Sequence, residues 1–98
     1  MYHINDLIGK TITIRSIKGD EYIAKLLGVD ADQGLLTVAE PRVVVIDNES
    51  VMLFPFALTA KTDTVTLHST EIFAVLETMP EAAQDYDTVV AQSADSGA

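Results

Sequence analysis

Few side chains in this sequence could carry out acid–base or nucleophilic chemistry. His3 and His68 are the only histidines, and the 98 residues include no cysteine. A general base at His68 would need a carboxylate such as Glu71 to orient it, and short polar residues between strands more often serve a turn. The sequence also has no Gly-rich phosphate loop, nucleophile elbow or paired-histidine motif. We therefore expect neither enzyme activity nor a cofactor.

The acidic stretch DADQG, residues 30–34, begins like a calcium-binding loop. Such a loop needs Gly at its sixth position and Glu at its twelfth. Counting from Asp30, those positions hold Leu35 and Pro41. A solvated turn between strands explains the acidic residues better, so we expect no metal site.

The charge of the chain is strongly negative and unevenly distributed. The net charge is −9, and five of the 15 acidic residues lie from Glu77 onward, where no base occurs, which leaves −4 on the preceding part. Proteins that bind nucleic acid by neutralising phosphates usually carry a basic field. The distribution argues against strong polyanion binding, although a local basic patch could form from Lys10, Arg15, Lys18 and Lys25.

The composition predicts one small β-rich domain. Hydrophobic residues make up 48% of the chain and aromatic residues 6%, so the core must consist mainly of Ile, Leu, Val and Ala. β-Branched residues favour strands. The start, MYHINDLIGK, lacks the basic end and long apolar stretch of a signal peptide, and the longest apolar run, VMLFPFAL, is too short to cross a bilayer. We expect a soluble, cytoplasmic protein.

The hydrophobic pattern predicts the order of the elements. Ile4, Leu7 and Ile8 at helical spacing, followed by Gly9, predict a short helix. Gly28 marks a bend or bulge in a strand, and Gly34 is free to take a positive φ in the turn 30–34. Alternating apolar and polar residues predict strands at 10–17, 21–29 and 34–40, and a final pair at 64–68 and 72–77.

Residues 43–54 form a less regular segment. Two aliphatic runs, 42–47 and 51–54, are joined by DNES and bounded by Pro41 and Pro55, which cannot donate to a central ladder. The prolines place the base of this hairpin at an edge or a bulge. Because both faces of both arms are apolar, the hairpin either packs against the body or another subunit, or extends the barrel core.

The end of the chain has a helical pattern. Pro80 occupies a first helical position, and apolar residues then recur on one face. We expect a domain over residues 1–79, a helix over 80–92, and a disordered tail over 93–98. The apolar positions of the helix are Ala82, Ala83, Tyr86, Val89 and Val90.

The order of these elements resembles the Sm-like family, which includes the Sm, LSm and Hfq proteins, over residues 4–77. In the first family motif a Gly precedes a strand that carries an aromatic residue, a small residue, a Leu and then a turn Asp. Gly19, Tyr22, Ala24, Leu26 and Asp30 stand at those places. The resemblance implies a mainly β, strongly bent, five-stranded SH3-like barrel with a short N-terminal helix, followed here by a C-terminal helix. A small barrel of SH3-like or OB type could carry the same pattern.

The stretch VTLHSTEIFAVL resembles the second family motif, in which an Arg-Gly step separates two apolar strands. Family members pair these two strands with adjacent subunits and so form a ring. The resemblance implies a homo-oligomer of about five to seven copies, whose closure removes open sheet edges. Its interface would include Val65, Leu67, Phe73 and Val75.

The resemblance also implies a site for single-stranded RNA. Family rings stack a base on a turn side chain, read its edge with an Asn and bracket it with the Arg of the Arg-Gly step. Here the stacking position is Asp32, the Asn position is Gly34, and the Arg-Gly step is His68 and Ser69, with only the turn Asp, Asp30, kept. Carboxylates repel phosphates and a histidine is at best partly charged, so the usual uridine pocket is degraded.

Two functional hypotheses follow. The first is a ring-forming Sm-like protein with an RNA-related role, binding single-stranded RNA by a route other than the usual pocket. The second is an acidic protein-interaction or structural ring without nucleic-acid binding, with protein partners. The resemblance favours the first, and the negative charge favours the second.

Overall fold

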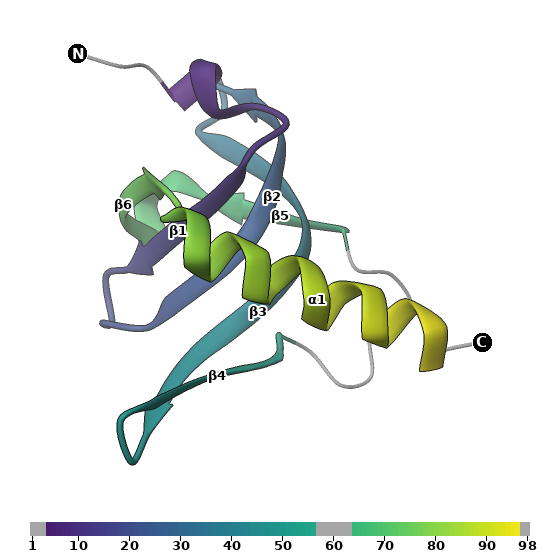
Figure 1. Ribbon diagram of the computed structural model, residues 1–98. Coiled ribbons are helices and arrows are strands. Elements are labelled where there is room, and N and C mark those ends of the chain that lie inside the picture. The colour runs from purple at the N-terminus through teal and green to yellow at the C-terminus, as the bar shows by residue number, and fades with distance from the viewer. Residues whose placement is uncertain (1–3, 57–63, 97–98) are drawn as a thin grey trace.

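The structure is a computed structural model that describes the backbone of residues 4–56 and 64–96 and the side chains of residues 4–56 and 64–92. Figure 1 shows a bent sheet with one long helix across it. In chain order the elements are η1 (Ile4–Leu7), β1 (Thr11–Ser16), β2 (Glu21–Asp30), β3 (Leu35–Asp47), β4 (Ser50–Pro55), β5 (Thr64–His68), η2 (Ser69–Glu71), β6 (Ile72–Glu77) and α1 (Pro80–Ser96).

The strands form one antiparallel sheet in the order β4-β3-β2-β1-β6, and β5 pairs with β3 as well. Alternate residues of β1, β2 and β3 point inward, as the sequence alternation predicts. Leu7 of η1 covers one end of this core and is 2% exposed. The buried cluster consists of Leu7, Ile12, Ile14, Ala24, Leu26, Leu36 and Val38.

Two predicted backbone features of β2 and its turn are confirmed. Leu26 pairs with Val38 and Gly28 pairs with Thr37, so Leu27 is the extra residue of a bulge beside Gly28. Gly34 has a φ of +67°, the left-handed conformation that a glycine adopts without strain. The bulge bends β2 and the glycine ends the turn into β3.

The described residues form six strands, so the prediction of a five-stranded barrel is wrong in its count. The runs 34–40 and 42–47 belong to one 13-residue strand, β3, which passes through Pro41. Lys25 pairs with Ala39 and Ile23 pairs with Arg42, so Glu40 and Pro41 form a bulge opposite one residue of β2. A bulge leaves residues outside the ladder, and the missing N–H of Pro41 is tolerated there. The long β3 then pairs with β5 through its first half and with β4 through its second.

The β3–β4 hairpin extends away from the rest of the sheet (Figure 1). Asp47 pairs with Ser50, and the two turn residues Asn48 and Glu49 have φ of 49° and 68°, as the twist of a two-residue hairpin requires. The cross-strand pair at the tip, Ile46 and Val51, is 71% and 60% exposed. Burial of the tip against the body of the same chain, one of the predicted outcomes, is therefore not observed in the described residues.

The helix α1 lies across the outer face of the sheet and begins at Pro80, as predicted. The predicted apolar face is half-buried or buried, and Tyr86 is 2% exposed. The Tyr86 hydroxyl donates to the carbonyls of Ala39 and Glu40 at 3.1 and 2.9 Å. The helix continues past residue 92 to Ser96, because no Gly or Pro occurs before Gly97 to end it. Residues 97 and 98 of the predicted tail lie outside the described residues.

None of the helices in the described part of the chain is long and apolar enough to cross a membrane.

The Tyr86 hydroxyl gives a prediction for the stability of the fold at alkaline pH. Burial, with a smaller contribution from the charge of Glu40, raises the pKa of Tyr86 from 10.0 to about 12. A raised pKa in the folded state means that the neutral hydroxyl contributes stability below pH 10, and that this stability is lost as the pH rises towards 12. We expect Tyr86→Phe to lower the free energy of unfolding by about 1–2 kcal/mol at neutral pH, since two carbonyls lose a donor.

Urea unfolding followed by circular dichroism checks this expectation. Wild type should lose stability between pH 10 and about 12, and Tyr86→Phe should show a flatter profile over the same range. Tyr22→Phe is compared in parallel, because it also removes a hydroxyl with a raised pKa but leaves the anchor of α1 in place. Equal alkaline loss in wild type and Tyr86→Phe would contradict the role given to this hydroxyl.

Candidate functional site

The β2–β3 turn carries three of the predicted RNA-binding residues. Asp30 accepts a hydrogen bond through Oδ1 from the backbone N–H of Gln33 at 3.1 Å, which closes the turn. Asp32 is exposed at the tip, and Gly34 in its left-handed conformation leads into β3. The Asp30 side chain therefore stabilises the turn, whereas the carboxylate of Asp32 is exposed to solvent.

The other two predicted residues, His68 and Ser69, lie directly beside this turn. His68 pairs with Leu35, and the backbone N–H of Ser69 donates to the carbonyl of Gly34 at 2.8 Å. A Cβ placed on Gly34 would lie 2.8 Å from Oγ of Ser69. The structure thus brings together two turns that are far apart in the sequence. It also shows that an Asn at Gly34 would displace the Ser69 hydroxyl.

The side chains at this site supply little positive charge. His68 and Ser69 are exposed, and the turn beside them presents Asp30 and Asp32. A single imidazole beside a turn with two carboxylates is a weak site for a phosphate. Within the described residues, no group of three or more His, Asp or Glu side chains could hold a metal ion.

The four bases considered for a basic patch are spread from Lys10, just before β1, through β1 and its turn to β2. Lys10 lies 3.8 Å from a carboxylate oxygen of Glu77, and Arg15 lies 3.9 Å from one of Glu21. Both pairs are half-exposed, so they contribute little to stability. They nevertheless place a negative charge beside two of the four bases, which weakens the positive field available to a polyanion.

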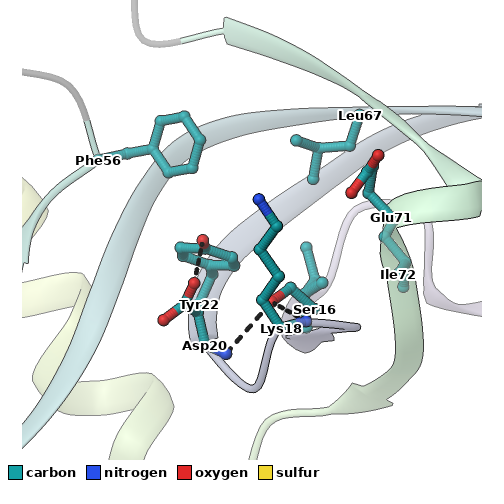
Figure 2. A pocket seen from close by; sticks show the side chains of 9 residues that line it. Ser16, Lys18, Asp20, Tyr22, Phe56, Leu67, Glu71 and Ile72 are labelled. Carbon is teal, nitrogen blue, oxygen red and sulfur yellow. Dashed lines mark hydrogen bonds between the residues drawn. The ribbon is translucent and has the colours of Figure 1, made fainter.

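A pocket of about 290 Å³ lies between the β1–β2 turn, the end of β4, β5 and η2. Figure 2 shows Lys18 extending into the space between Phe56 and Leu67, with Tyr22 beside it and below Phe56. Tyr22 and Phe56 form an edge-to-face pair with ring centroids 5.4 Å apart. Burial, and then the nearby charge of Asp20, raises the pKa of Tyr22.

Sequence reasoning did not find this pocket. Tyr22 was noted only as a motif residue, and Phe56 lies far from it in the sequence. The contact depends on the passage of β3 and β4 beside the start of β2: Tyr22 pairs with Val43, and Val43 pairs with Phe54. No local pattern contains that information, although the aromatic residues at 54 and 56 gave a weak sign of an apolar surface.

The four predicted interface residues fall into two groups. Val65, Leu67 and Val75 are partly buried and pack against the core. Phe73 is 76% exposed. In the described part of the chain, β5 pairs only with β3 and β6 pairs only with β1, so each strand has one edge without a partner strand.

No protein-family model matches the sequence, and no curated protein matches it. Solved structures do match. A heptameric archaeal Sm protein superposes with a TM-score of 0.55 and 14% identity, over 78% of this chain and 96% of the other. The Sm protein of Pyrococcus abyssii in complex with a uridine heptamer gives 0.54 and 17%, over 76% and 92%.

A third neighbour is of a different kind. A chain of the NatC complex bound to CoA superposes with a TM-score of 0.54 and 16% identity, over 88% of this chain and 96% of the other. At such low identities, structural likeness establishes the fold. The chain has the Sm fold, and the resemblance seen in its two motifs is confirmed at that level.

The turn at Asp30 gives a prediction that separates structural from binding roles. Asp30→Ala should lower the free energy of unfolding by about 0.5–1.5 kcal/mol, because the Gln33 N–H loses its acceptor. Asp32→Ala, which removes a carboxylate with no hydrogen bond to another described residue, should change it by less than about 0.5 kcal/mol. Urea unfolding of the two variants measures the difference, and equal losses would show that the Asp30 contact is unimportant.

Proposed function

We propose that this chain assembles into a homo-oligomeric ring of about five to seven copies and has an RNA-related role, acting by binding rather than by catalysis. The observation that carries the proposal is the contact between Gly34 and Ser69. It joins the two turns that the resemblance assigns to RNA binding, on a fold whose β5 and β6 edges are open. Both parts of the proposal rest on the Sm fold.

Assembly is supported by the open edges and by the neighbours. A strand edge with unpaired N–H and C=O groups is a template for pairing with another chain, and apolar residues at such an edge favour aggregation unless pairing closes on itself. Pairing the β5 edge of one copy with the β6 edge of the next would cover these two edges in every copy of a closed ring. One of the matched structures is a heptameric archaeal Sm protein.

The RNA-related part is supported by the site and by one neighbour. The Sm protein of P. abyssii is in complex with a uridine heptamer. The present turns carry Asp32, Gly34 and His68 where stacking, base reading and a cation are needed, so we infer that the uridine pocket is degraded. RNA binding should accordingly be weak, with little preference among bases.

The alternative is an acidic protein-interaction ring that binds no nucleic acid. It is favoured by the carboxylates that lie beside Lys10 and Arg15. It is also favoured by the net charge of −4 on residues 1–76. The neighbour from the NatC complex is consistent with it, since that chain belongs to an assembly named as a complex. Titration of the protein with RNA distinguishes the two roles.

RNA titration tests the proposed role. We expect labelled U-rich, A-rich and mixed oligonucleotides to bind weakly and alike at low salt. Binding should be lost at physiological salt, because it is weak already and salt screens the few phosphate contacts that hold it. Fluorescence anisotropy measures this. Tight, U-selective binding at physiological salt would contradict the degraded pocket, and no binding at low salt would favour the protein-interaction ring.

A gain-of-function variant tests the position of the site. Gly34→Asn, His68→Arg and Ser69→Gly together restore the base-reading amide and the Arg-Gly step, and the third change removes the hydroxyl that a side chain at position 34 would meet. We expect at least about tenfold tighter binding to U-rich RNA. Gln84→Arg on the exposed face of α1 adds the same charge as a control and should gain much less. Equal gains would show that charge alone, and not this site, is responsible.

A further inference from the structure

The outer edge of β4 lacks the features that usually keep an open strand edge from pairing. Such features are charged side chains, prolines within the strand and bulges. β6, at the other end of the sheet, has a bulge in which Phe73 is the residue without a partner in β1. β4 pairs in unbroken register with β3, contains no charged residue, and has its one proline, Pro55, at its end.

The hairpin also lacks a third strand along much of its length. It projects from the sheet (Figure 1), and β2 pairs with β3 no further than Val43. Among the described residues, 44–47 of β3 therefore pair only with β4. A two-stranded hairpin is marginally stable in water, and three or more strands are needed to stabilise an apolar face. Alternation places Val44, Ile46, Val51 and Leu53 on one face and Val45, Met52 and Phe54 on the other.

The two-residue turn determines which backbone groups of β4 point outward. Asp47 and Ser50 flank this turn, and residues in that position form a hydrogen-bonded pair. Hydrogen-bonded and non-hydrogen-bonded pairs then alternate, so Val51, Leu53 and Pro55 direct their backbone groups away from β3. Pro55 has no N–H and loses no bond to β3 at such a position. The outward N–H donors of β4 are therefore those of Val51 and Leu53.

These outward groups are complementary to themselves. An antiparallel second copy that places its Leu53 opposite Val51, and its Val51 opposite Leu53, uses both outward donors and both carbonyls of each copy. Met52 then lies on a two-fold axis, opposite its own counterpart. On one face, Ile46 and Val51 continue into Leu53 and Val44 of the second copy, so apolar side chains form a continuous row across both hairpins.

We propose that two copies of this chain pair through the β4 edges of their hairpins, in an antiparallel two-fold register centred on Met52. The two hairpins then form one four-stranded sheet, and the same surface is used on both copies. The other edge of the hairpin cannot pair in this way, because β2 occupies the position beside Val43 where the second hairpin would continue. The pairing uses neither β5 nor β6, so it is independent of the proposed ring.

Disulfide formation across the two-fold axis tests the register. The chain has no cysteine, so each single-cysteine variant reports on contact with its own counterpart. Met52→Cys should form a covalent dimer on mild oxidation, because residues of a non-hydrogen-bonded antiparallel pair lie within disulfide range. Phe54→Cys is the matched control, since Phe54 lies on the same face of β4 and is 43% exposed against 42% for Met52. It should give far less dimer, because this register places it opposite Ser50.

A second measurement does not depend on cysteine variants. Val51→Lys should raise the dissociation constant of the two-fold pairing by more than about tenfold in sedimentation experiments, because it places a charge opposite Leu53 at the paired edge. Ile46→Lys makes the same change of charge at the neighbouring exposed residue of β3, away from that edge, and should raise it much less.

The outcomes distinguish this pairing from the ring. Equal crosslinking of Met52→Cys and Phe54→Cys, or none of Met52→Cys, would overturn the register. A wild type whose mass is unchanged by Val51→Lys would overturn the pairing and leave the ring proposal standing. A wild-type dimer that Val51→Lys converts to a monomer would support the pairing and refute the ring.

Discussion

β3 stays paired with β2 along both of its halves only because its backbone forms a bulge at Glu40 and Pro41, opposite Ala24. The φ of Glu40 is +49°, a conformation that a residue other than Gly adopts only when its surroundings hold it there. Tyr86 of α1 provides such a restraint, since its hydroxyl binds the carbonyls of Ala39 and Glu40. The C-terminal helix and the bend in the sheet therefore stabilise one another.

The bend determines what the sheet leaves uncovered. The first half of β3 holds β5 and the second half holds β4, so one strand has two partners along the same edge. The second half carries the apolar hairpin away from the core (Figure 1), and the first half leaves β5 as an edge close to the turn at Gly34. Exposed edges and exposed apolar residues in one small domain are a liability for a monomer, and the proposed ring would cover the β5 and β6 edges.

Much of the fold could be predicted from the sequence because it depends on local patterns. The alternation in TITIRS, the glycines at 28 and 34, and Pro80 at the start of the helix each act through a few neighbouring residues. The continuity of β3 could not be predicted, since a proline usually ends a central strand and only the bulge removes the conflict. The order of the motifs predicted the Sm fold, but it could not show that β3 has two partners on one edge.

The candidate site was predicted unevenly for a similar reason. The turn residues Asp30 to Gly34 and the pair His68 and Ser69 follow from their order in the motifs, and the structure joins the two turns through the hydrogen bond from Ser69 to Gly34. Strict alternation would place Phe73 and Val75 on the same face, whereas the bulge leaves Phe73 exposed and Val75 against the core. The pocket at Tyr22 and Phe56 depends on a long-range contact that no local pattern contains.

The central claim is that the open edges of β5 and β6 pair between copies. Amide hydrogen exchange, measured at dilute and at high protein concentration, tests it most directly because edge amides exchange quickly unless a partner strand accepts them. We predict that exchange in both Thr64–His68 and Ile72–Glu77 slows together as the concentration rises, while the exposed turn at Asn48 and Glu49 changes less. An assembled protein whose β5 and β6 amides exchange as fast as they do in dilute solution would contradict the account.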